Sequence, residues 1–267
     1  MTDAEAYESR FGGIGRLYGA ESLERLASGH VAVVGIGGVG SWAAEALARS
    51  GVGKITLIDL DDVCITNTNR QVPALGGAVG RPKVTVMAER MRRINPDCTI
   101  EAVQDFLTPT TSDALLTPGF DYLIDAIDNS RHKAHLIVAC RERKIPIVTA
   151  GGAGGRWDPS QVMCDDLTEA FNDGLLRRVR KHLRREYGYP LSDDPWGIPA
   201  IYSRERPVFP TPDGGLCRHG AASASHKLDC AEGFGAASFV TGTYGFAAAA
   251  VAVKALANPV TPTRLPE

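Results

Sequence analysis

The sequence contains no C-x-x-C pair, although its 267 residues include six cysteines. Cysteines this widely separated exclude a zinc knuckle and a dense disulfide framework, and they are typical of reduced thiols. The first ten residues, MTDAEAYESR, are polar and acidic and do not have the apolar centre of a secretory signal. We therefore expect a cytoplasmic protein that holds no zinc.

An excess of positive charge is also missing. Lysine and arginine total 29 against 31 aspartates and glutamates, which gives a formal net charge of −2. This balance excludes nucleic-acid binding through overall charge, although it leaves a local basic patch possible. The hydrophobic content of 44% is ordinary for a globular protein, and the length suits a single domain spanning residues 1–267.

Long runs of leucine and isoleucine are absent, and this decides how one apolar segment is interpreted. Residues 233–257, GFGAASFVTGTYGFAAAAVAVKALA, are about as long as a membrane span. Alanine, glycine, serine and threonine dominate the segment, and such small residues pack closely against a sheet. We expect a buried C-terminal strand and helix, and no membrane partner.

Apolar runs alternate with helical patterns along most of the chain. Val31–Gly35 and Ile55–Asp59 are short, rich in β-branched residues and bounded by glycine or acids, as buried parallel strands are. Similar runs recur at 98–103, 122–126, 145–150 and 161–165, with helical periodicity between them. The pattern predicts an α/β fold: a Rossmann-like, doubly wound, mostly parallel sheet, with a nucleotide-binding core at 12–166.

The remainder, 167–267, has a different character. Residues 172–189, NDGLLRRVRKHLRREYGY, predict a basic helix with Asn172 or Asp173 as its N-cap. Residues 188–215 are rich in proline, glycine and aspartate and predict a long crossover loop before the final strand and helix. The basic side chains of the helix are Arg177, Arg178, Arg180, Lys181, Arg184 and Arg185. Such a run is more often a solvated face than a binding site.

A glycine motif lies between the first strand and the helix that follows it. Gly35, Gly37 and Gly40 form G-x-G-x-x-G, which brings phosphates to the N-terminus of a helix. Asp59 ends the second strand, where a carboxylate accepts hydrogen bonds from ribose hydroxyls. The motif predicts nucleotide binding, but it does not distinguish NAD from ATP.

The residues after Asp59 favour a triphosphate. Asn67, Arg70, Gln71 and Lys83 lie within one short window, and cations of this kind neutralise charge that develops on phosphate oxygens. Two further carboxylates, Asp125 and Asp128, lie at the C-terminal end of a strand, where a carboxylate is well placed to hold Mg2+ on the phosphates. The alternative readings are a solvated Lys83 and a simple helix cap at Asp128–Asn129.

These motifs together resemble the ubiquitin-activating-enzyme-like superfamily, whose bacterial members include MoeB and ThiF. The matching positions are Gly35, Gly37, Gly38 and Gly40; Asp59 and Asp61; Asn67, Arg70 and Gln71; Gly80 and Lys83; and Asp125, Asp128 and Asn129. The resemblance implies ATP binding and transfer of AMP to a carboxylate, with pyrophosphate leaving. It also implies that Asp59 binds the ribose, that Arg70 and Lys83 clamp the phosphates with help from Asn67, and that Asp128 coordinates Mg2+.

Within this superfamily, the stretches RFGGIGRLYG, DLDDVCITNTNRQ, VTAGGAGG and LDCAEGFGAASFVTGTYGF are similar to the tRNA threonylcarbamoyladenosine dehydratases. That similarity implies ATP-dependent cyclisation of the threonylcarbamoyl group on adenosine 37 of tRNA, and the basic helix then becomes a phosphate-binding surface. It implies a homodimer in which Arg16, or alternatively Arg10, reaches the partner's site. It leaves open a bound monovalent cation.

Departures from MoeB and ThiF leave alternatives open. Those relatives carry two C-x-x-C pairs for zinc and adenylate the C-terminal glycine of a ubiquitin-like sulfur carrier, and the missing pairs disfavour both features here. An NAD(P)-dependent oxidoreductase and a non-enzymatic nucleotide sensor are weaker alternatives. Cys230 is either an inert buried thiol or a reactive cysteine that receives sulfur from a cysteine desulfurase or sulfur-acceptor system.

Overall fold

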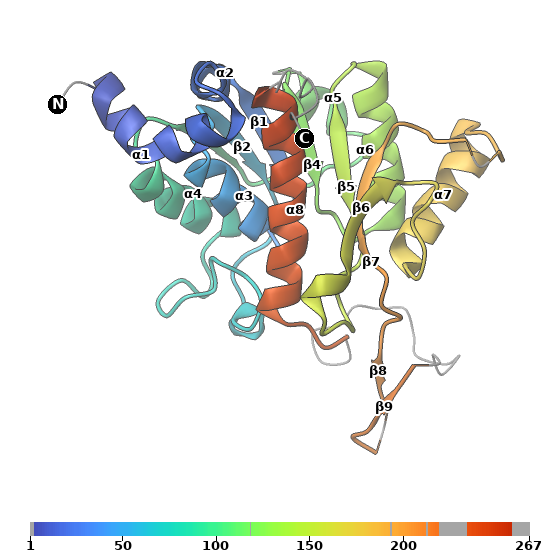
Figure 1. The fold of residues 1–267 in the computed structure, drawn as a ribbon. Coiled ribbons are helices and arrows are strands. Elements are labelled where there is room, and N and C mark those ends of the chain that lie inside the picture. The colour runs from blue at the N-terminus through green and yellow to red at the C-terminus, as the bar shows by residue number, and fades with distance from the viewer. Residues whose placement is uncertain (1–2, 118, 193, 212, 219–233, 258–267) are drawn as a thin grey trace, which may run out of the picture.

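A computed structural model describes residues 3–117, 119–192, 194–211, 213–218 and 234–257 (Figure 1). Cys230 lies outside these residues, so the two readings of this cysteine stay predictions.

The centre of the molecule is a seven-stranded sheet with the order β3-β2-β1-β4-β5-β7-β6 (Figure 1). Six strands are parallel, and only β6 runs antiparallel to its neighbour β7. The order reverses between β1 and β4, which creates the crevice where ligands of open α/β sheets bind. The strands are β1 His30–Val34, β2 Lys54–Ile58, β3 Thr99–Val103, β4 Tyr122–Asp125, β5 Ile147–Ala150, β6 Val162–Asp166 and β7 Pro199–Ser203.

Helices cover both faces of the sheet (Figure 1). Helices α3 (Gly40–Arg49), α4 (Lys83–Ile94) and α8 (Ser238–Ala257) cover one face, and α5 (Ser112–Leu116), α6 (Ser130–Glu142) and α7 (Gly174–Tyr187) cover the other. The remaining elements are α1 Asp3–Tyr18, α2 Ser22–Ser28, the short helices η1 Ile65–Asn67 and η2 Pro159–Gln161, and the hairpin strands β8 Phe209–Pro210 and β9 Leu216–Cys217.

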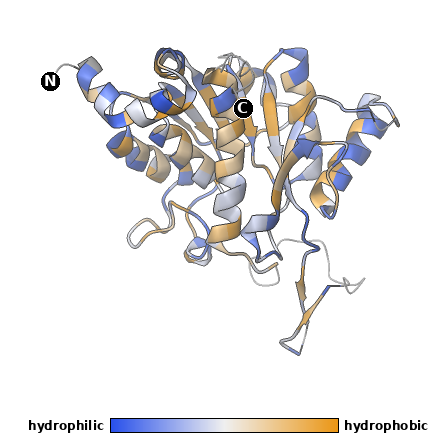
Figure 2. Ribbon diagram, in the orientation of Figure 1, coloured by the Kyte–Doolittle hydropathy of each residue, from blue (hydrophilic) through white to orange (hydrophobic). Residues whose placement is uncertain are grey.

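Two hydrophobic cores follow from the alternation of side chains along the strands. Val31 and Val33 of β1 point into the core beneath α3 and α8, whereas Ala32 and Val34 point into the core beneath α6 and α7. All five residues of β1 are buried, as expected of a strand covered on both faces. Figure 2 shows the resulting contrast between apolar strands and a strongly hydrophilic α7. The doubly wound, mostly parallel fold predicted from the sequence is confirmed.

Two local predictions are wrong. The crossover loop contains strand β7, which lies between β5 and β6 because Ala200, Ile201 and Tyr202 are apolar enough to be buried in the sheet. In the described part of the segment, 234–257, residues 234–237 have no regular secondary structure and the rest forms α8, so the strand expected before the helix is not found in this part. This helix is long and apolar enough to cross a membrane, but it packs on α3 and four strands of the sheet as a core helix.

Candidate functional site

The glycine loop forms a tight turn between β1 and α3 at the switch point of the sheet. Gly35 has φ +88°, and a Cβ atom there would lie 2.8 Å from the carbonyl oxygen of Ala126, just after β4. A Cβ atom at Gly40 would overlap the carbonyl oxygen of Gly35. Both positions therefore require glycine, which brings the N-terminus of α3 close to the carboxyl ends of β1 and β4.

Residues 67–71 fold over this loop. The backbone N–H groups of Arg70 and Gln71 both donate to the carbonyl oxygen of Asn67, at 3.0 and 2.9 Å. A Cβ atom at Gly38 would lie 3.5 Å from Cδ of Arg70, and one at Gly37 would lie 4.0 Å from Nε2 of Gln71. The loop, Asn67, Arg70 and Gln71 are thus brought together as the sequence predicts.

Two side chains from other elements hold Arg70 in position. The indole N–H of Trp42 on α3 donates to the carbonyl oxygen of Arg70 at 3.0 Å, and the hydroxyl of Thr241 on α8 donates to the same oxygen at 3.3 Å. The amide of Asn69 donates to the carbonyl oxygen of Ala236 at 2.8 Å. Trp42, Thr241 and Ala236 carry no local sequence signal for this role, because the contacts form only when α8 packs against the site.

One polar atom in this window has no protein partner. Oε1 of Gln71 is buried and accepts no hydrogen bond from the part of the chain that the structure describes. A buried acceptor of this kind normally costs stability unless a ligand or water satisfies it. Its place beside Gly37 therefore favours a ligand over the glycine loop.

Asp59, which follows β2, contacts the glycine loop through Ile36. Its carboxylate accepts from the backbone N–H of Ile36 at 2.5 Å and from that of Asp61 at 2.8 Å. Burial raises the pKa of Asp59 above its ordinary value, and the positive charge of Lys83 opposes this shift. A carboxylate that hydrogen-bonds the loop at the end of β2 stands where a nucleotide's ribose hydroxyls would bind.

Lys83 opens α4 and points back toward the acids after β2. Its side chain is 7% exposed, and Nζ donates to Oδ2 of Asp61 at 2.8 Å. A solvated first-turn lysine is therefore ruled out. The charge of its ammonium group opposes the rise that burial causes in the pKa of Asp59, so Lys83 belongs to the same cluster as Asp59 and the glycine loop.

The two carboxylates after β4 have different environments. Asp125 is completely buried, forms an ion pair with Lys133 at 2.8 Å and accepts a hydrogen bond from the hydroxyl of Thr149 at 2.7 Å. Both of its carboxylate oxygens are thus engaged inside the protein, and Asp128 stays the predicted Mg2+ ligand. Asp128 is exposed. Asn129 is the N-cap of α6, since its Oδ1 accepts from the backbone N–H groups of Arg131 and His132.

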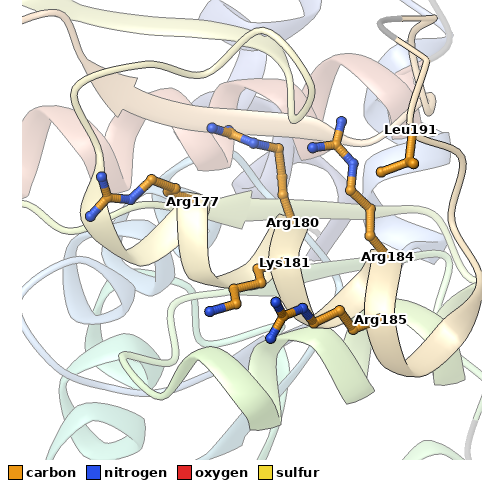
Figure 3. A pocket seen from close by; sticks show the side chains of 6 residues that line it. All are labelled: Arg177, Arg180, Lys181, Arg184, Arg185 and Leu191. Atoms are coloured by element: carbon orange, nitrogen blue, oxygen red, sulfur yellow. The ribbon is translucent and has the colours of Figure 1, made fainter.

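The basic helix α7 presents four exposed cations, Arg177, Arg178, Lys181 and Arg185. The other two are partly engaged: Arg180 donates to the carbonyl oxygens of Leu167 and Ala170, and Arg184 lies over the ring of Trp196, 5.3 Å from its centroid. Burial lowers the pKa of Arg180. A shallow hollow of about 300 Å³ is lined by Arg177, Arg180, Lys181, Arg184 and Arg185 of this helix together with Leu191 (Figure 3).

The helix begins with the expected cap. Asp173 accepts hydrogen bonds from the backbone N–H groups of Leu175 and Leu176, so it, and not Asn172, is the N-cap of α7. Within the described residues, no group of three or more His, Cys, Asp or Glu side chains is arranged to hold a metal ion.

The two N-terminal arginines lie away from the glycine loop of their own chain. Helix α1 is anchored by the hydroxyl of Tyr7, which donates to the carbonyl oxygen of Gly51 at 2.5 Å, beyond the C-terminus of α3. Arg10 pairs with Asp97 at 3.3 Å, whereas Arg16 is exposed. Because the glycine loop is at the other end of α3, neither arginine reaches it within one chain.

Comparison with known proteins agrees with this geometry. Residues 13–264 match the ThiF family. The chain belongs to the ThiF family. Its relatives in that family include the tRNA threonylcarbamoyladenosine dehydratase of Escherichia coli K12, which is 50% identical over 253 residues and covers 94% of each chain. The enzyme of the same name from Haemophilus influenzae is 48% identical over 249 residues, 92% of each chain.

A solved structure extends the similarity to three dimensions. The E. coli tRNA N6-threonylcarbamoyladenosine dehydratase in complex with ATP superimposes with a TM-score of 0.84 at 46% identity, and the match covers 96% of this chain and 97% of that one. The similarity therefore extends over nearly the whole of both chains.

Proposed function

We propose that this protein catalyses the ATP-dependent cyclisation of N6-threonylcarbamoyladenosine at position 37 of tRNA. The observation that carries the proposal is the 50% identity to a dehydratase of that name over nearly the whole chain. The site is also suited to the reaction, since a glycine loop at a helix N-terminus is flanked by Arg70 and the buried Lys83.

ATP binds with its phosphates over Gly35, Gly37, Gly38 and Gly40 and its ribose against Asp59, beside Asp61. The buried acceptor of Gln71 supports a ligand at this point, and the ATP complex of the E. coli relative supports ATP as that ligand. Asn67, Arg70 and Lys83 surround the phosphates, where their charge and amide groups stabilise the reacting oxygens.

The reaction proceeds in two steps. The carboxylate of the threonyl group attacks the α-phosphorus of ATP, an acyl–AMP bond forms and pyrophosphate leaves. The carbamoyl group of the same nucleoside then attacks the acyl carbon, a ring closes and AMP departs. The net change is the loss of one water from the nucleoside, with ATP converted to AMP and pyrophosphate. Arg70 and Lys83 neutralise charge in the first step, and the bound geometry makes the second step intramolecular.

Asp128 is the carboxylate we assign to Mg2+. It is exposed at the carboxyl end of β4, beside the glycine loop, whereas Asp125 is buried and paired. Carboxylate oxygens together with substrate phosphates are the ligands that Mg2+ ordinarily uses. The ion would supply charge neutralisation on the phosphates. Asn129 would act indirectly, because its side-chain oxygen caps α6.

We assign tRNA phosphate binding to the exposed cations of α7. Arg177, Arg178, Lys181 and Arg185 are free of the carbonyl contacts that hold Arg180. A helix with this charge on a protein of net charge −2 is a local patch suited to an RNA backbone. A tRNA substrate also agrees with a cytoplasmic location.

We further propose that two chains form a homodimer in which Arg16 acts in the partner's site. The argument is geometric: α1 lies beyond the far end of α3 from the glycine loop, and Arg10 is already paired with Asp97. Arg16 is exposed and therefore available to a second chain. A role for Cys230 with a sulfur donor stays a prediction.

One experiment tests the proposed reaction. The protein is incubated with ATP, Mg2+ and tRNA that carries the threonylcarbamoyl group. The tRNA is then digested, and the mass of the modified nucleoside is measured by mass spectrometry. We expect a loss of one water with stoichiometric AMP. Transfer of AMP to a ubiquitin-like carrier protein, with an unchanged nucleoside, would contradict the proposal and support the alternative; the absence of zinc-binding C-x-x-C pairs disfavours that outcome.

A further inference from the structure

Exposed aromatic rings lie near the residues that connect β5 and the start of α8 to the window after β2. Trp157, just after the GGAGG stretch at 151–155, is 49% exposed, and Phe234 is 43% exposed. Phe234 packs against Phe209 of the β8–β9 hairpin, with ring centroids 4.9 Å apart. The guanidinium of Arg218 lies over the Trp157 ring, 5.8 Å from its centroid. None of these groups has a role in the reaction as described above.

Trp157 is held on a rigid base. The preceding residue, Arg156, is almost fully buried, pairs with Asp173 at 3.4 Å and donates to the carbonyl oxygens of Gly152 and Asn172. The backbone N–H of Trp157 donates to Oε2 of Glu205 at 3.2 Å. An exposed ring on a fixed backbone loses little conformational freedom when a partner binds it.

The cluster is connected to the nucleotide window by a short segment. Gly155 donates from its backbone N–H to the carbonyl oxygen of Gly235 at 2.7 Å and accepts from the N–H of Val208 at 2.8 Å. One residue further, the carbonyl oxygen of Ala236 accepts from the side chain of Asn69, which precedes Arg70. Phe234 therefore stands two residues from a contact with the site that binds ATP. In Figure 1 the β8–β9 hairpin extends beyond the sheet near the start of α8.

A surface that combines exposed aromatic rings with arginine is suited to bind unpaired RNA bases. Bases that are not in a helix stack on aromatic side chains and on guanidinium planes, whereas a double-stranded region offers only its backbone. The two exposed arginines of the neighbouring segment, Arg204 and Arg206, add positive charge for the phosphates between such bases. The basic helix α7 does not offer the same contact, because its exposed groups are cations.

We propose that Trp157 with Arg218, together with Phe234 on Phe209, forms a stacking platform for the unpaired nucleotides that flank the reacting adenosine. This inference rests on the proposed function, since it names the part of the RNA that the face binds. The platform would hold the loop of the substrate while the nucleoside enters the ATP site, and α7 would bind phosphates of the paired stem.

The test uses the full chain and an anticodon stem–loop RNA that carries the threonylcarbamoyl group. We expect Trp157→Ala to weaken RNA binding by about tenfold, the loss of roughly one stacked base, and Trp157→Phe to restore most of it. Binding of the RNA should quench the fluorescence of the wild-type protein, and the quenching should be lost in Trp157→Phe. The ATP dissociation constant should not change. Phe246→Ala, which alters a ring 50% exposed on α8, is the matched control.

Salt dependence separates the platform from a charged surface. Stacking releases no counterions, so Trp157→Ala should lower RNA affinity without changing the slope of log K against log salt. Unchanged affinity and no quenching, with nucleoside dehydration intact, would overturn the platform and leave the proposed function standing. Failure of the wild-type protein to dehydrate the nucleoside would instead reject the proposed function. A change in oligomeric mass without a change in RNA affinity would identify the face as a contact between chains and likewise overturn the inference.

Discussion

Lys133 on α6 forms an ion pair with Asp125 at the end of β4, at 2.8 Å, and both side chains have no exposed surface. Nζ of Lys133 also donates to the carbonyl oxygen of Asp125 at 3.2 Å, and the Asp125 carboxylate accepts from the backbone N–H of Ile127. This pair therefore fixes the turn at 126–128, which packs against Gly35 and carries Asp128. Its role is to position the turn, not to touch ATP.

We predict that Lys133→Met destabilises the protein by about 3–5 kcal/mol, because it leaves the Asp125 carboxylate buried without a partner. Burial raises the pKa of Asp125, so the unfolded chain ionises more readily than the folded one. The destabilisation should therefore be smallest below about pH 4 and should increase as the pH rises through the unfolded pKa. Urea unfolding at several pH values measures it.

Two variants make the comparison specific. The double variant Asp125→Asn with Lys133→Met should lose less stability than Lys133→Met alone, since no charge is left stranded. Lys254→Met, at an exposed lysine of α8, should change stability by less than about 0.5 kcal/mol. Equal losses of stability in Lys133→Met and Lys254→Met would show that the buried ion pair contributes no more to stability than an exposed lysine.

Lys83 provides the second prediction, because its ammonium group is buried beside Asp59 and Asp61. Lys83→Met should slow pyrophosphate release by about 100- to 1,000-fold, the usual effect of removing one group that stabilises developing charge. Lys83→Arg should recover part of the rate. Asp61 is 69% exposed and is not stranded by the change, so the fold should persist. Lys54→Met, at the opposite end of β2, is the control, and a similar loss of rate in that variant would contradict the assignment.

Local sequence patterns were sufficient to predict the glycine loop, but not the buried ion pair between Asp125 and Lys133. The positive φ of Gly35 and the overlap of a Gly40 Cβ with the carbonyl oxygen of Gly35 arise within one strand–turn–helix unit, so the spacing predicts glycine at both positions, whereas the close approach of Ala126 to Gly35 depends on the fold. Asp125 and Asp128, by contrast, look equivalent in the sequence as carboxylates after the same strand. Only burial and the approach of Lys133 from the next helix distinguish them.

Strand β7 shows a second limit of prediction from the sequence. The run PAIYS lies in a segment rich in proline and glycine, and its five residues are too few to give a clear periodicity. What makes it a strand is its pairing with β5, whose residues come about fifty positions earlier, and with β6. Similarly, Thr241 reaches Arg70 only because α8 returns across the sheet. Contacts between distant parts of the chain leave little trace in a local pattern.

The exposed cations of α7 lead to the third prediction. Leu175, Leu176, Val179 and Leu183 bury one side of this helix, which leaves Arg178 and Lys181 in solvent. The double variant Arg178→Ala with Lys181→Ala should weaken tRNA binding and reduce the steepness of its salt dependence by about one to two units of slope. ATP affinity should be unaffected. Filter binding over a range of salt concentrations gives both quantities.

Its control is Arg93→Ala with Lys254→Ala, which removes the same charge from exposed positions on α4 and α8. If this control flattens the salt dependence as much as the α7 variant, then general charge and not α7 binds the RNA.

The last prediction concerns Glu45 on α3. Its carboxylate is buried and accepts hydrogen bonds from Arg90 on α4, at 2.7 and 3.0 Å, and from Arg49, at 2.9 Å. Burial alone would raise the pKa of Glu45, but the bonds from Arg90 and Arg49 outweigh it and lower the pKa below its ordinary value. The charged form therefore links α3, which begins at the glycine loop, to α4, which begins at Lys83.

A lowered carboxyl pKa stabilises the folded state above the unfolded pKa, and this contribution is lost as the pH falls through the folded value. Glu45→Gln should therefore reduce stability by about 1–2 kcal/mol near pH 7, a figure reduced for the solvent exposure of both arginines. The difference from the wild-type protein should begin to shrink as the pH falls below about 4, the pKa of an unfolded glutamate, and should disappear once the pH is below the lowered folded pKa and Glu45 is neutral. Thermal unfolding of the two proteins between pH 3 and pH 8 measures the difference, and a gap that is constant across that range would contradict the assignment of a charged Glu45.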